Sequence, residues 1–112
     1  MTTERRRRRS EKQHEALTLF FENVARKLGL EALALSTADG RLVAGARHSA
    51  AVDLDLEWMG NVGASRQRAK LEWDERTLYV RRLSVNDVSL YLTSAGREAD
   101  RGIDDGIRRI LA

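Results

Sequence analysis

Apolar residues recur at spacings of three and four between residues 11 and 28, which places them on one stripe of a helix. The stripe consists of Ala16, Leu17, Phe20, Phe21, Val24, Ala25 and Leu28. Ser10 is a suitable N-cap, and Gly29 stands where a C-terminal glycine is favoured. The pattern therefore predicts a first amphipathic helix over 11–28.

Two apolar runs follow, at 30–37 and 41–46, with the dipeptide Asp39-Gly40 between them. This dipeptide indicates a tight hairpin, because a two-residue primed turn needs positive φ at its central residues. The first run is apolar on both of its faces, which is typical of a central strand that is covered on both sides. We therefore predict a β-hairpin.

A second helix is predicted between residues 52 and 70. Its apolar positions fall on two adjacent stripes, Val52, Leu56, Met59 and Gly63 on one and Leu54, Trp58 and Val62 on the other. Acidic residues stand at its start and basic residues at its end, as the helix dipole favours; these are Asp53, Asp55 and Glu57, then Arg66, Arg68 and Lys70. Gly60 and Gly63 each cost about 1 kcal/mol relative to alanine inside a helix. Either the helix is irregular there or another backbone approaches it closely.

The last third of the chain contains three short apolar runs, at 71–74, 77–84 and 88–94, with turns at 75–76 and 86–87. An amphipathic helix over 97–111 follows. The order is thus α-β-β-α-β-β-β-α. It predicts an α+β fold (an α/β sandwich), in which a five-stranded, mostly antiparallel sheet has helices on both faces.

The positive charge of the chain is concentrated at its start. The run Arg5, Arg6, Arg7, Arg8 and Arg9 against Glu4 gives residues 1–9 a net charge of +4, so the remaining residues sum to −1 in a chain of net charge +3. Adjacent arginines repel one another and bury nothing. We therefore expect a disordered arginine-rich tail at 1–10 and a single domain at 11–112, a suitable length for one domain.

Composition also limits the cellular setting. The chain has no cysteine, so disulfides and cysteine-bound metals are excluded. It has no apolar run of the roughly 20 residues that span a bilayer, and no apolar segment of signal-peptide type follows the arginines. We expect a cytoplasmic protein.

The candidate catalytic and metal-binding residues of the chain have simpler explanations. His48 and Ser49 near Asp53 lack the sharp turn and oxyanion-hole glycines of a serine nucleophile, and a polar linker explains them better. His14 has no second histidine nearby to share a metal. Asp100, Asp104 and Asp105 alternate with arginines, which indicates a salt-bridged solvent face rather than a calcium site. No phosphate-binding loop is present. We predict no enzyme, no cofactor and no metal.

The order of elements, the hairpin LALSTADGRLVAGA and the later segment LYVRRLSVNDVSLYLTS together resemble the roadblock/dynein light chain family. The resemblance covers roughly residues 14–111. It implies a non-enzymatic protein that dimerises, with the second helices of two protomers packed together and the third strands paired. It also implies a bacterial protein associated with a Ras-like small GTPase, as an activating partner or a scaffold.

Carried onto this sequence, the resemblance implies a dimer and partner interface at Leu54, Leu56, Trp58, Met59, Val62, Leu71 and Trp73. The residues themselves indicate the same surface, because tryptophan is enriched at interface hot spots and the chain has only Trp58 and Trp73. Each tryptophan could instead close the core of its own domain. Our hypothesis is a homodimeric adaptor that binds a Ras-like small GTPase, or another roadblock protein acting on one, in the control of polarity, motility or trafficking.

Two other functions remain open. The arginine run could contact nucleic-acid phosphates or an anionic membrane, but it lacks the aromatic residues that stack on bases, and we expect neither to be the main partner. A small sensor domain of profilin-like or PAS-like topology could hold a ligand between sheet and helix. Ala32 and Ala34 speak against a sensor, because they favour a closely packed helix over a cavity.

Overall fold

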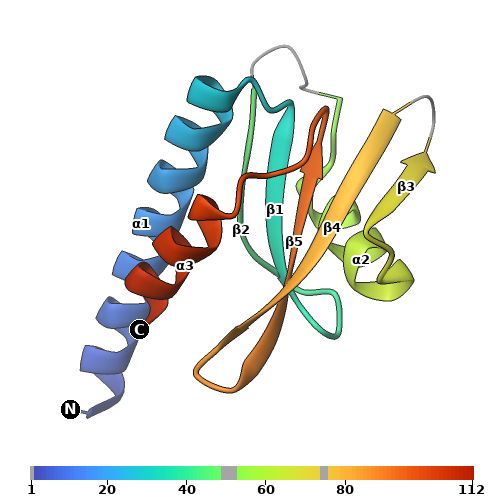
Figure 1. Ribbon diagram of the computed structural model, residues 1–112. Coiled ribbons are helices and arrows are strands. Elements are labelled where there is room, and N and C mark those ends of the chain that lie inside the picture. Colours follow the sequence, from blue (N-terminus) through green and yellow to red (C-terminus); the bar gives the residue numbers. More distant parts are fainter. Residues whose placement is uncertain (1, 49–52, 74–75) are drawn as a thin grey trace.

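A computed structural model describes the backbone of residues 2–48, 53–73 and 76–112, with side chains from residue 11 onward. Its elements are α1 (Thr2–Leu28), β1 (Ala32–Thr37), β2 (Leu42–Arg47), α2 (Leu56–Arg66), β3 (Lys70–Trp73), β4 (Arg76–Val85), β5 (Val88–Ala95) and α3 (Gly102–Leu111). The five strands form one sheet in the order β2-β1-β5-β4-β3, and its pairings are antiparallel (Figure 1). The predicted α+β class, element order and helices on both faces are confirmed. The polar linker predicted at His48 and Ser49 and the turn predicted at 75–76 fall partly outside the described residues.

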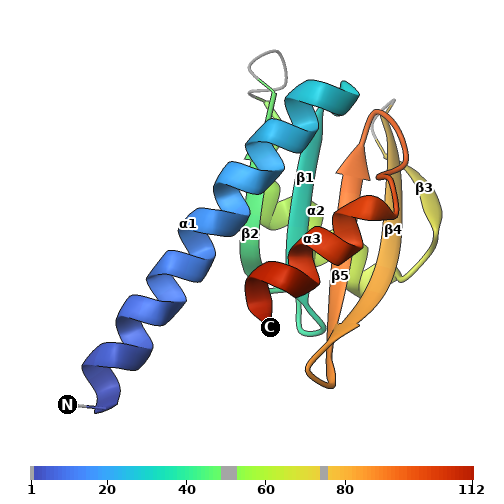
Figure 2. The same cartoon turned by 60° about the vertical axis from the view of Figure 1, so that its left-hand side comes forward.

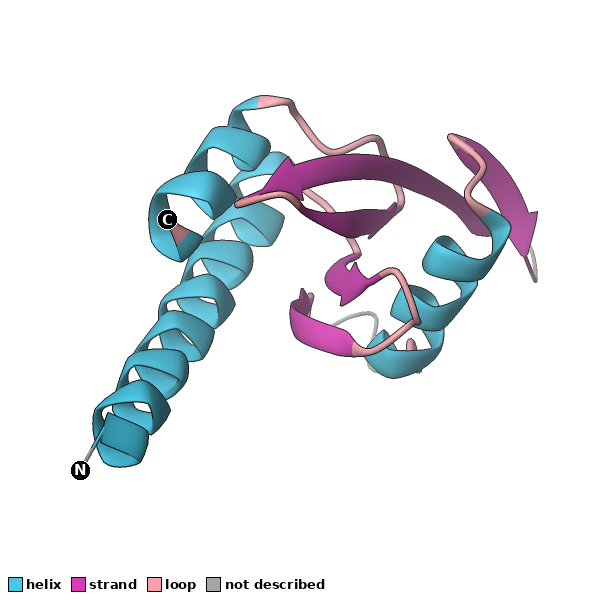
Figure 3. Cartoon of the chain, turned by 90° about the horizontal axis from the view of Figure 1, so that it is seen from below, coloured by secondary structure: helices cyan, strands magenta, loops and turns pink. Residues whose placement is uncertain are grey.

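The sheet separates two unequal cores. Figure 3 shows α1 and α3 against one face and α2 against the other. The core under α1 and α3 is built from large aliphatic and aromatic side chains, such as Leu17, Phe21, Leu33, Leu92 and Ile107. The core under α2 is built on small residues of the sheet, Ala32, Ala34 and Ala95, with Met59 and Leu78. The central strand β1 is therefore covered on both faces, as its apolar pattern predicted.

Helix α1 is longer than the sequence predicted. It begins at Thr2 rather than at residue 11, so the backbone of the arginine run is helical. Arginine is a good helix former, and residues 2–28 contain no glycine or proline. The helix extends well past the end of the sheet at its N-terminal side (Figure 2). The division of the chain into a tail and one domain stays a prediction.

The two hairpin turns correct one expectation. The turn at Asp39-Gly40 is not a two-residue primed turn, because only Gly40 has positive φ, at 88°. The Thr37 N–H instead donates to the Arg41 carbonyl at 2.9 Å, and the Gly40 N–H donates to the Thr37 carbonyl at 3.0 Å. The register shifts just before this turn, between Leu35 and Ser36, as longer hairpin loops with a bulge require. The primed two-residue turn occurs at 86–87, where both residues have positive φ.

The glycines of α2 let the helix lie unusually close to the sheet. The helix is continuous from Leu56 to Arg66, so the alternative of an irregular helix is wrong. A Cβ atom at Gly63 would lie 2.0 Å from the Thr93 Oγ1, and one at Gly60 would lie 3.1 Å from the Ser36 Cβ. The Ser36 hydroxyl also donates to the Gly60 carbonyl at 3.0 Å. The space beside these glycines is therefore filled by the side chains of Thr93 and Ser36, and not by another backbone as the other alternative predicted.

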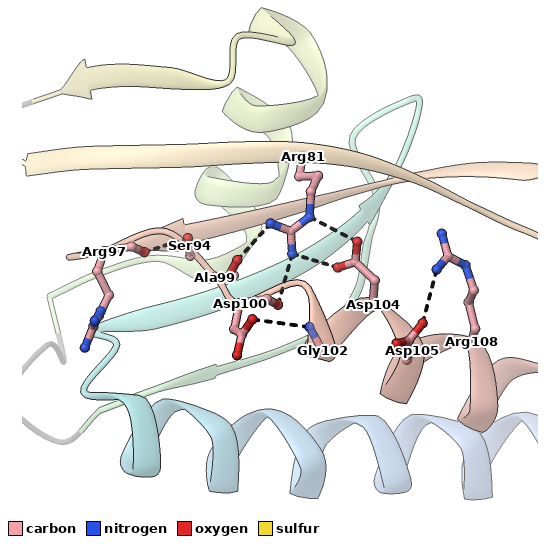
Figure 4. Close-up of polar contacts among 9 residues, drawn as sticks. All are labelled: Arg81, Ser94, Arg97, Ala99, Asp100, Gly102, Asp104, Asp105 and Arg108. Atoms are coloured by element: carbon pink, nitrogen blue, oxygen red, sulfur yellow. Dashed lines mark hydrogen bonds and ion pairs between the residues drawn. The ribbon is translucent and has the colours of Figure 1, made fainter.

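Helix α3 begins later than predicted, at Gly102 instead of residue 97. The preceding loop is held by Arg81 of β4, whose guanidinium donates to the carbonyls of Ala99 at 2.8 Å and Asp100 at 3.2 Å (Figure 4). These carbonyls are therefore bonded to a side chain of the sheet. The same guanidinium forms a two-pronged ion pair with Asp104, at 2.7 and 3.1 Å. Asp104 is thus buried against the sheet, and its assignment to a solvent face is wrong.

Candidate interaction surface

Strand β3 forms one edge of the sheet. It pairs with β4 over its whole length, from Lys70 opposite Tyr79 to Trp73 opposite Arg76. In an antiparallel pair every second residue directs its backbone N–H and C=O away from the partner. Its outer edge therefore carries backbone groups that bond to no other strand of the described sheet. An edge of this kind can accept a strand from another chain.

The two tryptophans meet beside this edge. The rings of Trp58, in the first turn of α2, and Trp73, at the end of β3, have centroids 5.5 Å apart and stand edge to face at 60°. The Arg66 guanidinium lies 5.9 Å from the Trp73 ring centroid. Trp73 is 41% exposed, whereas Trp58 is half-buried. Neither ring is sealed inside the protomer, so the indole pair presents apolar surface to solvent.

The predicted interface residues divide into two groups. We use the name indole surface for the five that reach solvent, which are Leu56, Trp58, Val62, Leu71 and Trp73. Leu54 and Met59 are 4% and 0% exposed and pack inside the α2 core with Leu78, so the protomer offers a partner almost none of their surface. The assignment of both groups to an interface stays a prediction.

An acidic hollow lies on one side of Trp73. It is lined by Glu31, Asp53, Leu54, Asp55, Trp58, Trp73, Arg76 and Leu78. Three carboxylates and one guanidinium give it a formal net charge of −2. Arg76 forms an ion pair with Asp53 at 2.8 Å, and this hydrogen-bonded guanidinium lowers the pKa of the Asp53 carboxyl below its usual value. Asp55 is the N-cap of α2 and accepts hydrogen bonds from the N–H groups of Glu57 and Trp58.

A basic hollow shares Trp73 but extends toward the other end of α2. It is lined by Arg66, Arg68, Lys70, Leu71, Glu72 and Trp73. Three cations and one carboxylate give it a formal net charge of +2. Among the residues that the structure describes, Arg66, Arg68 and Lys70 form no ion pair. The sequence pattern contained these charges, but it related them only to the dipole of α2 and not to a surface.

The structure also places the residues that the sequence offered as candidates for catalysis or metal binding. In the described ranges, no group of three or more histidine, aspartate or glutamate side chains is placed to hold a metal ion. His14 is exposed, and its Nδ1 lies 3.0 Å from the Val43 carbonyl oxygen, within hydrogen-bonding distance. Asp105 lies 3.6 Å from Arg108 on the solvent side of α3. Ser49 lies outside the described residues. None of the described helices is both long and apolar enough to cross a membrane.

Comparison with known proteins reveals similarity at the level of the fold. No family model matches the sequence, and no curated protein matches it. Among solved structures, a gliding protein MglB from Thermus thermophilus has a TM-score of 0.68 at 15% identity, over 88% of this chain and 90% of that one. An MglB with a tetrameric arrangement has a TM-score of 0.67 at 16% identity, with the same coverage. Myxococcus xanthus MglB has a TM-score of 0.55 at 11% identity, over 88% and 84% of the two chains.

Proposed function

We propose that this chain, which has the roadblock-type fold of the MglB proteins, is a cytoplasmic, homodimeric regulator of a Ras-like small GTPase. It would bind the GTPase directly or through another roadblock protein, in the control of polarity, motility or trafficking. Such a protein acts through its surfaces and needs no catalytic side chain of its own. Its affinity for partners is then the whole of its mechanism.

The observation that carries this proposal is the indole surface beside the open edge of β3. In proteins that remain monomeric, an edge strand is usually protected from pairing with another chain by charge, proline or a covering segment. Here the edge strand carries the charged residues Lys70 and Glu72, but it ends in a 41% exposed tryptophan whose ring meets a second one edge to face. An interface formed by strand pairing uses both features. Hydrogen bonds between the backbones supply affinity, and aromatic rings act as binding hot spots. The similarity to an MglB with a tetrameric arrangement supports self-association.

The GTPase part of the proposal rests on the fold. The similar structures include a gliding protein, and the roadblock family, which the sequence resembles, works beside Ras-like GTPases. An adaptor role also agrees with the positions of the ion pairs. Of the three ion pairs described above, Asp53–Arg76 lies beside the indole surface, Asp104–Arg81 secures α3 to the sheet, and Asp105–Arg108 lies on the solvent side of α3. These ion pairs have a role in the structure or on the surface, and an adaptor does not need them for catalysis.

Dimerisation is tested by replacing one exposed ring. We expect wild type to elute as a dimer at about 50 µM, since an interface of micromolar affinity is then largely assembled. Trp73→Glu places a charge in the indole surface and is expected to give a folded monomer. The matched control is Leu19→Glu, at a leucine that is 60% exposed on α1, and it should remain dimeric. Size exclusion with light scattering reports the mass. A monomeric wild type would refute the proposal.

Partner choice is tested separately, with the nucleotide state under control. Immobilised wild type and Trp73→Glu are exposed to cytoplasmic extract loaded with GDP or with a non-hydrolysable GTP analogue. We expect wild type to retain a Ras-like small GTPase in one nucleotide state more than in the other. Addition of the purified chain should then change the rate of GTP hydrolysis by that GTPase. If no GTPase is retained in either state, the regulatory role is wrong even though the dimer exists.

A second candidate function rests on the helical arginine run. Helix α1 extends past the sheet (Figure 2), so residues 5–9 lie at the end of a projecting helix. A net charge of +4 in residues 1–9 suits anionic membrane or nucleic acid. Binding to anionic vesicles or to DNA should then fall steeply with salt and vanish when residues 2–9 are removed. Binding that survives this truncation would exclude the arginine run as its cause.

A further inference from the structure

We infer that two copies of this chain join with the acidic hollow of each protomer facing the basic hollow of the other, and that this charge pairing selects the partner copy. The inference rests on the proposed dimer and adds its orientation and its specificity. The feature behind it is the position of two hollows of opposite charge, −2 and +2, on the two sides of Trp73.

The charges lie far enough apart to act separately. Helix α2 has 11 residues and is thus about 16 Å long. Asp53 and Asp55 stand before its first turn, whereas Arg66 and Arg68 stand at its end. The Debye length at physiological ionic strength is about 8 Å. Each end of α2 therefore presents its own charge to a partner, instead of a cancelled average.

Symmetry allows these charges to be matched in only one way. In a two-fold dimer the same patch serves both subunits, and a residue contacts in its partner whatever the partner contacts in it. If the axis ran along α2, the acidic hollow would face its own copy, and like charges that face each other cost several kcal/mol. If the axis crosses α2, each acidic hollow faces a basic one. Trp73 borders both hollows, so it lies near the centre of the second arrangement.

The cations of the basic hollow are available for such a contact. Within the described chain Arg66, Arg68 and Lys70 have no carboxylate partner, and all three are exposed. In the acidic hollow only Asp53 is in an ion pair, with Arg76 at 2.8 Å. The carboxylate of Glu31 is exposed and in no ion pair among the described residues. Each hollow thus has charge left for a second copy, and the two net charges are equal and opposite.

The consequence is selectivity. A second copy of this chain has an acidic hollow toward one end of α2 and a basic hollow toward the other, as the two-fold contact requires. Another protein of the same fold fits equally well only if it has the same order of charges. Electrostatic complementarity acts on partner choice and association rate more than on total affinity. We therefore expect association to slow as salt rises, while the indole surface supplies most of the binding energy.

The test uses two variants that cannot pair with themselves. Glu31→Lys/Asp53→Lys makes both hollows basic, and Arg66→Glu/Arg68→Glu makes both acidic. Each is expected to weaken self-association by about a hundredfold. Mixed one to one they restore opposite charges at both contacts, so a heterodimer should form that neither variant forms alone. Native mass spectrometry distinguishes the three dimers. Asp55 is left in place because it caps α2.

Matched controls carry the same change of net charge on the other side of the sheet. Glu15→Lys/Glu22→Lys and Lys12→Glu/Lys27→Glu alter exposed residues of α1 and should leave self-association within about twofold. Circular dichroism establishes that each variant is folded. The inference is overturned if the folded mixture stays monomeric, or if either charge-reversed variant dimerises like wild type. Both outcomes leave the wild-type dimer and the proposed function standing, whereas a monomeric wild type refutes both.

Discussion

Removal of the Asp104 carboxylate is predicted to destabilise the fold far more than removal of its neighbour Asp105. Asp104 meets Arg81 through two hydrogen bonds of 2.7 and 3.1 Å (Figure 4), and the two side chains are 13% and 20% exposed. Asp105 lies 3.6 Å from Arg108 and is 76% exposed. Both carboxylates stand in the first turn of α3, so they share any interaction with the helix dipole. The comparison therefore isolates the ion pair with the sheet.

The expected loss of unfolding free energy depends on how deeply the ion pair is buried. Breaking a fully buried pair costs about 3–5 kcal/mol, because the remaining charge is left without a partner. Water reaches both groups here, and Arg81 keeps its bonds to two carbonyls, so we expect about 2–3 kcal/mol for Asp104→Ala. This corresponds to a drop in Tm of roughly 10 °C for a domain of this size. For Asp105→Ala we expect less than about 0.5 kcal/mol.

Urea unfolding, followed by circular dichroism, measures both free energies under identical conditions. A third variant, Arg81→Met/Asp104→Leu, removes both charges at once. It should recover only part of the loss, since the apolar pair leaves no unpaired charge but also removes the Arg81 hydrogen bonds to the carbonyls of Ala99 and Asp100. If Asp104→Ala and Asp105→Ala differ by less than about 0.5 kcal/mol, the Arg81 contact does not secure α3 and the reasoning is refuted.

The remaining predictions concern α2 and the acidic hollow. Gly63→Ala should destabilise the protein by about 1 kcal/mol or more despite its better helix propensity, because the new Cβ meets the Thr93 hydroxyl. Ser65→Ala, at an exposed position of the same helix, should instead be neutral or slightly stabilising; equal effects of the two substitutions in thermal unfolding would contradict the close approach. The Asp53 carboxyl should titrate below its ordinary pKa of 3.8 by NMR, and Arg76→Gln should bring it back toward that value. Since the pKa of Asp53 is lowered in the folded protein, any stability from this pair is present above the ordinary pKa. It is lost as the pH falls through the lowered pKa. If Arg76→Gln leaves the pKa of Asp53 unchanged, another group causes the shift.

Most of the fold could be predicted from short-range patterns. The apolar stripes and strand runs identified every element and their order, because amphipathic periodicity reports which face each element buries. The exact ends were less predictable. The start of α3 depends on Arg81, which lies far away in the sequence and holds the carbonyls of Ala99 and Asp100. No local pattern contains that contact.

The candidate site was only partly predictable for the same reason. The sequence identified Trp58 and Trp73 as surface residues of neighbouring elements, and the structure places their rings 5.5 Å apart. It also assigned Met59 to the surface, although Met59 lies in the core under α2. Two adjacent apolar stripes do not reveal which of their residues turn inward. The grouping of Glu31 with Asp53 depends on the sheet, which brings distant segments of the chain together.

The tight seating of α2 has a consequence for how a partner would be recognised. Backbone and small side chains separate this helix from β1 and β5 at Gly60 and Gly63, so there is little slack for it to tilt or slide. Whatever binds there meets a preformed platform whose shape is already set by the sheet. Recognition of this kind involves little rearrangement of the backbone, and evolution of a new partner would have to proceed by exchanging outward-facing side chains while the helix itself stays where it is.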